Sequence, residues 1–213
     1  SSVATSAARD VSNKKLFFDI CEKHQIPVQV ISGENEGEYT FLGVLSGRPQ
    51  KPNFTVIDIG GGSTEFAYKK DEQYISKSFN IGCVRLTEMF FTSDPESEDQ
   101  IVKFNNYLTE NMINIPFSKG ELVAVAGTPT TVASLYLERP FDVQAIDGME
   151  LSREMLELIY RKLRPLNIEQ RRKLKGIDAP RADVIMAGVL ILRFVMDQLS
   201  LNKLIVSTRG VRY

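Results

Sequence analysis

The sequence predicts an α/β fold around a mixed sheet that opens with a three-stranded antiparallel meander. Strand-like and helix-like segments alternate along most of the chain, which favours a layered α/β domain over a helix bundle or a β-sandwich. Three β-rich runs joined by short polar turns occupy residues 54–81 and predict the meander. Two glycine turns, at 60–62 and at 127, directly follow apolar strands. Glycine lets backbone amides approach a ligand closely, so we expect function to depend on these turns.

The composition is that of a soluble globular protein. The chain has 213 residues, of which 43% are hydrophobic and 25% are charged, and this profile excludes disordered and collagen-like classes. No apolar run approaches the roughly 18 residues that a membrane-spanning helix needs. The formal net charge is −1, so the chain as a whole is not drawn to nucleic acid or to a membrane. We therefore expect neither as a partner.

Cysteine and histidine usage narrows the chemistry. Cys21 and Cys83 are too few for a disulfide framework and indicate a reducing, cytoplasmic compartment. His24 is the only histidine, which excludes a histidine-rich metal site. The chain starts without Met and without a signal region, which predicts a piece of a longer protein.

Before residue 54 the pattern predicts a helix over 11–24, a strand over 27–31, and a helix from Ser32 to about residue 44. The turn-rich segment that follows is the expected domain boundary. After it come strands at 54–59, 64–68 and 74–81. The segment Thr92 to Pro95 predicts a helix that has Pro95 in its first turn and runs to about residue 112. Further along we expect a strand at 122–126, helices at 130–137, 153–164 and 180–199, a loop at 138–148 and a strand at 204–207.

The strongest motif runs from Asp58 to Glu65. A core strand delivers Asp58 to its polar end, and a turn without Cβ atoms can then form a nest of amides for phosphate oxygens. Asp58 and Glu65 are oxygen ligands suited to Mg²⁺ or another divalent cation. The remaining members of the motif are the candidate phosphate ligands Gly60, Gly61, Gly62, Ser63 and Thr64.

Two better-known phosphate loops are excluded at this motif. No Gly-Lys-Ser/Thr follows, as a Walker A loop requires, and Glu65 stands where a dinucleotide fingerprint needs glycine. A tight hairpin turn without a ligand is the alternative interpretation. It explains the three glycines less well, because they cost conformational entropy that a hairpin does not require.

Other candidates have plain structural alternatives. Gly127 and Thr128 open a helix whose amides could bind an anion, although threonine there could be a simple cap. Glu36 could be a general base, or an acidic residue that complements the helix dipole. Arg9 and Arg181 could bind phosphate, or be surface charges. The basic segment 161–175 could guide a long polyanion, or be a solvated helix face.

The chain resembles the exopolyphosphatase/guanosine pentaphosphatase (Ppx/GppA) phosphatase family, which has an actin-like, ribonuclease H-like fold. Four segments match in order and together cover essentially the whole chain. They are residues 4–13, residues 30–36, residues 58–65, and residues 181–185 together with 206–212. Thr208 and Tyr213 depart from the family pattern, which often has acidic residues there.

The resemblance implies roles for individual residues. Glu36 falls on the catalytic glutamate that activates water, whereas Glu34 and Glu38 fall outside that role. Asp58 and Glu65 fall on positions associated with a divalent metal, expected to be Mg²⁺. Arg9 and Arg181 match arginines that contact phosphate. The implied activity is hydrolysis of a phosphoanhydride, with inorganic polyphosphate or guanosine pentaphosphate as substrate.

The resemblance also implies a domain organisation. Residues 1–46 match the end of a first actin-like domain, 47–53 a linker, and 54–213 a second such domain that lacks a closing helix. We therefore expect the 213-residue chain alone to have little activity. An ATP-dependent small-molecule kinase of the same superfold and a non-catalytic phosphate-binding module remain as alternatives. The oligomeric state is open, with a homodimer as one option.

Overall fold

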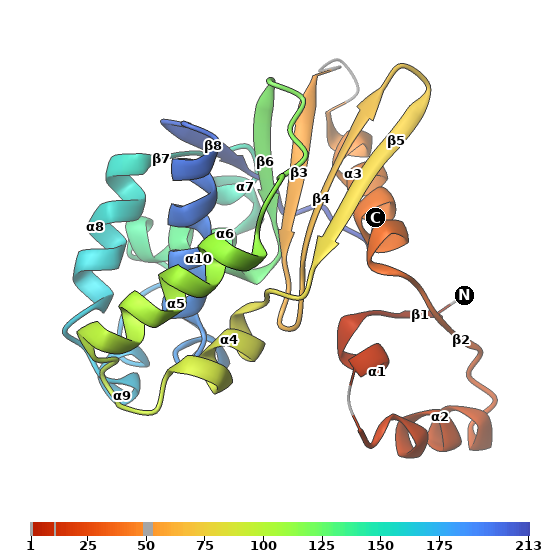
Figure 1. The fold of residues 1–213 in the computed structure, drawn as a ribbon, viewed down its shortest axis with the longest axis horizontal. Helices are drawn as coiled ribbons and strands as arrows, with labels where there is room; N and C mark the ends of the chain where they lie inside the picture. Colours follow the sequence, from red (N-terminus) through yellow and green to blue (C-terminus); the bar gives the residue numbers. More distant parts are fainter. Residues whose placement is uncertain (1, 11, 49–52) are drawn as a thin grey trace.

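The computed structural model describes residues 2–10, 12–48 and 53–213, with the side chains of residues 7 and 10 left out. It has a small N-terminal part and a large mixed sheet with its helices (Figure 1). The predicted linker falls largely on residues 49–52, which lie outside the described residues. Among the described helices, none combines the length and apolar character needed to cross a membrane.

The N-terminal part is built on two short strands. β1 (Ser2–Ala4) pairs in parallel with β2 (Val28–Val30), and between them lie α1 (Ser6–Asp10) and α2 (Lys14–Lys23). α3 (Gly33–Gly47) then leads to the large sheet, and the Ser32 side chain caps it by accepting from the Asn35 amide. The strand and helices predicted before residue 54 are thus confirmed, although β1 and α1 were not predicted.

The large sheet has six strands in the order β5-β4-β3-β6-β8-β7. β3 (Phe54–Ile59), β4 (Thr64–Lys70) and β5 (Gln73–Phe79) form the predicted antiparallel meander. β6 (Glu121–Val125) lies parallel to β3, and β8 (Lys203–Val206) lies parallel to β6. The edge strand β7 (Glu150–Ser152) runs antiparallel to β8. The mixed sheet opened by a meander is therefore confirmed.

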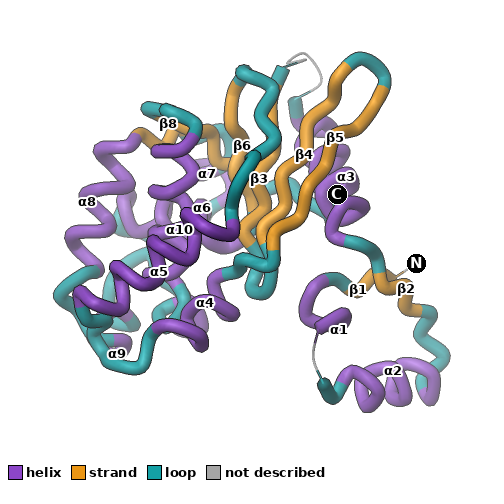
Figure 2. The backbone as a smooth tube through the Cα atoms, viewed as in Figure 1, coloured by secondary structure: helices purple, strands orange, loops and turns teal. Residues whose placement is uncertain are grey.

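Helices cover both faces of this sheet (Figures 1 and 2). One face packs against most of the helices, with Ile57 and Phe66 in the larger core cluster. The other face packs against α3, with Phe54 and Val56 beside Phe41 in the second cluster. Because successive residues of a strand point to opposite faces, Asp58 shares the face of Phe54 and Val56, which α3 covers.

The remaining helices follow the strands in chain order. They are α4 (Cys83–Phe90), α5 (Glu98–Asn111), α6 (Gly127–Leu137), α7 (Val143–Ile146), α8 (Arg153–Leu163), α9 (Ile168–Arg171), the 3-10 helix η1 (Ala179–Arg181) and α10 (Ile185–Gln198). The sequence did not predict α4, α7, α9 or β7. The last three are only three or four residues long, too short to show a periodic pattern.

The predicted helix start at Pro95 is wrong. α5 begins at Glu98, where Ser97 and Gln100 form a capping box. Residues just before this cap make contacts elsewhere in the fold: the Asp94 carboxylate accepts a hydrogen bond from the Ile168 amide, and Glu96 is buried against Arg171. Long-range polar contacts therefore hold this segment outside the helix.

The predicted continuous helix over 180–199 is also wrong. Pro180 lies in η1, and α10 starts only at Ile185. Bonds from the amides of Arg181 and Val184 to carbonyls three residues earlier tighten the backbone there. This interruption lets the Arg181 guanidinium lie against Gly127, where an added Cβ would come within 2.1 Å of it.

Candidate functional site

One cavity gathers the glycine motif and the candidate base. It has a volume of about 400 Å³, and its wall combines the turn between β3 and β4 with residues of the N-terminal part and of α4. We call it the glycine-loop cavity. It is lined by Thr5, Ser6, Glu36, Gly60, Gly61, Gly62, Ser63, Val84, Arg85 and Glu88. Residues from both sides of the predicted domain boundary therefore build one site.

The glycine loop presents its amides. Among the described residues, the amides of Gly61, Gly62 and Ser63 donate to no backbone carbonyl, whereas the Gly60 amide donates to Ser63 O over 3.0 Å. Such a row of unpaired amides is the arrangement that binds phosphate oxygens. Thr64 lies outside the cavity, because it is buried and its hydroxyl donates to Ile81 O over 2.6 Å.

Asp58 and Glu65 are direct cross-strand neighbours. The register pairs Asp58 of β3 with Glu65 of β4, which puts both carboxylates on the face covered by α3. Glu36 lies in the first turn of that helix. α3 can approach closely because a Cβ at Gly37 would lie 3.6 Å from the Glu65 Cβ and 2.3 Å from the Ser76 hydroxyl. Thus close helix–sheet packing sets three carboxylates near each other.

Burial raises the pKa of all three acids, and nearby like charges add to the increase at Asp58 and Glu65. Burial raises the pKa of Glu65 to about 8, and the nearby charges of Glu36 and Asp58 add to the increase. Burial and the Glu36 charge raise the pKa of Asp58 to about 6, although a hydrogen bond from Thr40 opposes them. Burial also raises the pKa of Glu36. Shifted acids of this kind concentrate at functional sites.

Arg9 holds Glu36 in place. Its Nη1 donates to Ile31 O over 2.6 Å and lies 3.6 Å from Glu36 Oε2. The positive charge of Arg9 lowers the pKa of Glu36 and so opposes the effect of burial. Arg9 thus lies beside the candidate base, and it is not among the residues that line the glycine-loop cavity.

Two buried carboxylate oxygens bear on the predicted divalent cation. One oxygen of Glu65 and one of Glu36 are buried without a hydrogen-bond partner among the described residues. A cation held by Asp58 and Glu65 would satisfy the Glu65 oxygen and offset the like charges that add to the raised pKa values of those two residues. In the described part of the chain, no three His, Cys, Asp or Glu side chains are gathered so that they alone could hold a metal. A cation at Asp58 and Glu65 would therefore take its other ligands from water, as Mg²⁺ commonly does, and Mg²⁺ stays a prediction.

The metal-free protein is expected to lose stability as the pH rises. The folded state holds protons on Asp58 and Glu65 more tightly than the unfolded state, so this contribution is present at low pH. It is lost as the pH rises through about 6 for Asp58 and about 8 for Glu65. Melting temperatures measured in chelator across this range test it. Glu65→Gln should flatten the upper part of the profile, and an unchanged profile would contradict the assignment.

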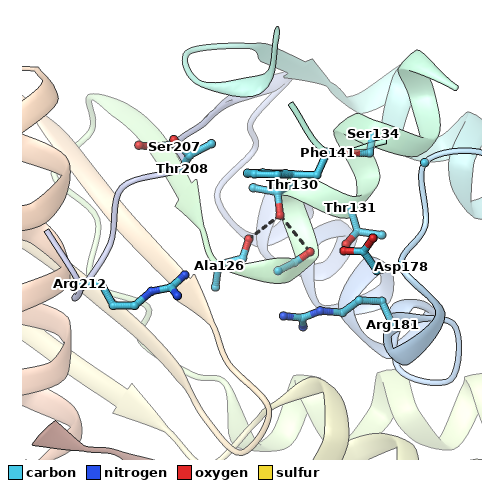
Figure 3. A pocket seen from close by; sticks show the side chains of 12 residues that line it. Ala126, Thr130, Thr131, Ser134, Phe141, Asp178, Arg181, Ser207, Thr208 and Arg212 are labelled. Carbon is cyan, nitrogen blue, oxygen red and sulfur yellow. Dashed lines mark hydrogen bonds between the residues drawn. The ribbon is translucent and has the colours of Figure 1, made fainter. Parts of the chain in front are cut away.

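The second glycine turn lines a different cavity. This second cavity has a volume of about 350 Å³ and includes Gly127, Arg181 and Arg212. Figure 3 shows the two guanidinium groups pointing toward each other from its two sides. Thr128 lines neither cavity, because it is 2% exposed and packs against Gly188. The structure therefore does not bring all the candidate phosphate residues to one place.

The second cavity has two unusual features. Ala126, just before α6, has φ 72° and ψ −164°, a conformation that costs a non-glycine residue about 1–3 kcal/mol. Thr130 donates to the carbonyls of Ala126 and Gly127 (dashed in Figure 3). The buried Ser134 hydroxyl on its wall has no partner among the described residues. Sequence reasoning missed Ser134, since nothing in a helical threonine- and serine-rich segment singles it out.

Sequence reasoning also missed Thr5, Ser6 and Arg85 on the glycine-loop cavity. A Cβ atom added to Gly62 would lie 2.4 Å from the Ser6 hydroxyl, so the glycine loop and the N-terminal part are in close contact. Arg85 lies in the first turn of α4, a helix that the sequence did not predict, so no sequence signal pointed to it.

Comparison with known proteins agrees with this architecture. The model of the Ppx/GppA phosphatase family matches residues 1–213. The bifunctional 3-dehydroquinate synthase/phosphatase of Fusobacterium nucleatum is 35% identical over 96% of this chain and 32% of its own length. Exopolyphosphatase 2 of Mycobacterium tuberculosis is 32% identical over 98% of this chain and 71% of its own.

Solved structures agree as well. The Aquifex aeolicus Ppx/GppA family member superposes with a TM-score of 0.87 at 32% identity, over 99% of this chain and 70% of that one. An exopolyphosphatase from Cytophaga hutchinsonii gives a TM-score of 0.86 at 28% identity, over 98% of this chain and 70% of that one. The large sheet therefore has the actin-like fold of these proteins. Because the family model matches its whole length and these structures match nearly all of it, the chain belongs to the Ppx/GppA phosphatase family.

Proposed function

We propose that the protein releases the terminal phosphate of inorganic polyphosphate by hydrolysis. One observation carries the proposal: a half-buried glutamate paired with an arginine and a row of unpaired loop amides line the same cavity. Membership of a phosphatase family and likeness to exopolyphosphatases support it. Guanosine pentaphosphate offers the same terminal phosphoanhydride and is the second substrate we propose to test.

The residues divide the chemistry between them. The amides of Gly61, Gly62 and Ser63 would donate to the oxygens of the terminal phosphoryl group and hold it in the cavity. Glu36 would accept a proton from water as that water attacks the terminal phosphorus and the bridging P–O bond breaks, which releases phosphate and a polyphosphate one unit shorter. The raised pKa of Glu36 brings it closer to the pH at which it must work. Arg9 keeps this carboxylate oriented toward the cavity.

Asp58 and Glu65 are the proposed protein ligands of a divalent cation. When bound, Mg²⁺ would supply positive charge that offsets the charge on phosphoryl oxygens. The two residues themselves contribute a fixed cross-strand pair of carboxylates. Binding requires both to be deprotonated, so the affinity for Mg²⁺ should increase with pH.

We propose Arg181 as a phosphate ligand together with Gly127, in the second cavity. Thr64 and Thr128 are then left with structural roles, because both are buried away from the two cavities. We also propose a cytoplasmic location, which the two free, buried cysteines favour.

The test is phosphate release by the full-length protein, with and without Mg²⁺. We expect release from polyphosphate that stops when a chelator is added. ATP consumption that depends on an added acceptor would instead indicate a kinase of the same fold. Binding of polyphosphate without turnover would indicate a binding module, and either outcome would overturn the proposed hydrolase.

A further inference from the structure

The N-terminal end of α4 packs against the glycine loop. The first backbone amides of α4 donate to carbonyls of that loop and are therefore not available to an anion. The Cys83 amide donates to Gly60 O over 3.0 Å, and the Val84 amide donates to Gly61 O over 2.9 Å. The approach is close, since a Cβ on Gly82 would lie 2.3 Å from Gly61 O. The N-terminal end of this helix therefore acts on the loop backbone.

These contacts determine which way the loop amides face. In a trans peptide the carbonyl and the amide hydrogen of the next residue point in opposite directions. Holding the carbonyls of Gly60 and Gly61 toward α4 therefore turns the amides of Gly61 and Gly62 away from that helix. Backbone donors make both contacts, so no substitution of a side chain removes them directly.

The third peptide is held by a side chain. Arg85 Nε donates to Gly62 O over 2.7 Å, and the same argument places the Ser63 amide on the far side from α4. Glycine readily adopts other backbone conformations, so this peptide needs a restraint. The Arg85 side chain also lines the glycine-loop cavity, on the same wall as Glu88.

We propose that Arg85 is a positioning residue for phosphate binding, which fixes the Gly62–Ser63 peptide so that the Ser63 amide faces the phosphoryl group. The inference rests on the proposed function, because it assumes that the loop amides bind a phosphoryl group. It adds a residue outside the glycine motif on which substrate affinity depends. A lysine cannot reproduce this contact, since the Nε–H is part of a rigid planar fork.

The experiment compares Arg85→Ala and Arg85→Lys with wild type in the full-length protein. We measure the dissociation constant of tripolyphosphate by calorimetry and KM and kcat for polyphosphate by phosphate release. Arg85→Ala should raise both the dissociation constant and KM about 10- to 100-fold, as expected for loss of a hydrogen bond from a charged group. kcat should change less than KM, and Arg85→Lys should recover only part of the loss.

Two further readouts separate positioning from a general structural role. Millimolar guanidinium ion should restore tripolyphosphate binding to Arg85→Ala, whereas methylammonium should not, because only guanidinium is a planar fork. The melting temperature should stay near that of wild type. Arg153→Ala is the matched control, since the Arg153 side chain is 41% exposed at the start of α8, outside the basic segment 161–175, and lines neither cavity.

A tripolyphosphate dissociation constant of Arg85→Ala within twofold of wild type overturns the proposal. A dissociation constant and KM of Arg85→Lys equal to those of wild type also overturn it, because they would show that Arg85 acts through its charge alone. If Arg85→Ala does not fold, Arg85→Lys decides by the same criterion. Tripolyphosphate binding also separates the two proposals. Wild-type protein that binds tripolyphosphate through Arg85 but hydrolyses nothing would contradict the hydrolase and leave this inference in place.

Discussion

Replacing Glu36 by glutamine should lower kcat for polyphosphate hydrolysis by about 10²- to 10⁴-fold, the usual contribution of a general base. Glutamine keeps the size of the side chain but cannot accept a proton from water. KM should change little, because the loop amides that would bind the phosphoryl group remain. Steady-state phosphate release with saturating Mg²⁺ measures both constants.

Glu34→Gln is the matched control for this prediction. Glu34 lies on the same turn of α3, but it is exposed and lines neither cavity. It should leave kcat within about twofold of wild type, as expected for a surface substitution. Full turnover by Glu36→Gln would show that another group, or the substrate itself, takes the proton.

Replacing Arg171 by methionine should destabilise the protein by about 3–5 kcal/mol. Arg171 is 0% exposed and forms a two-pronged ion pair with Glu96, which is 5% exposed. Removing the arginine leaves the Glu96 carboxylate buried without its charge partner. For a chain of this size, each kcal/mol lowers the melting temperature by about 2–4 °C. Urea unfolding followed by circular dichroism measures the loss.

Two variants check this explanation. Arg172→Met removes a neighbouring arginine whose pair with Glu169 is exposed, and it should cost less than about 1 kcal/mol. The double variant Arg171→Met with Glu96→Gln should recover much of the loss, because no buried charge is then left unpaired. A double variant as unstable as Arg171→Met would show that lost packing is the cause.

Much of the fold could be predicted because the central strands have a clear local sequence pattern. The runs from Phe54 and from Leu122 are apolar and end in glycine, so strand identity and the meander followed from local pattern. α4 was not predicted, since its eight residues include two β-branched ones and lie between stronger signals. The start of α5 was predicted wrongly, because the buried ion pair between Glu96 and Arg171 holds the preceding residues outside the helix. The two residues are 75 positions apart, so no local pattern shows the contact.

The candidate site was predicted in its types of residue but not in its arrangement. The motif from Asp58 to Glu65 identified the loop and the acids, since their chemistry is local. That Gly127 and Arg181 line a separate cavity depends on the interruption between η1 and α10. Arg85 was missed because its importance comes from a carbonyl 23 residues earlier, which no spacing rule shows.

The close packing of α3 on the meander also limits how the base can move. Added Cβ atoms at Gly33 and Gly37 would each lie 2.3 Å from a serine of β5. The backbone of α3 therefore packs directly against side chains of the sheet. A helix seated this way cannot slide or roll without steric overlap. The distance from Glu36 to the acids of β3 and β4 is therefore set by repulsion between atoms. Enlarging Ser76 or Ser78 would move the base without changing any residue of the cavity.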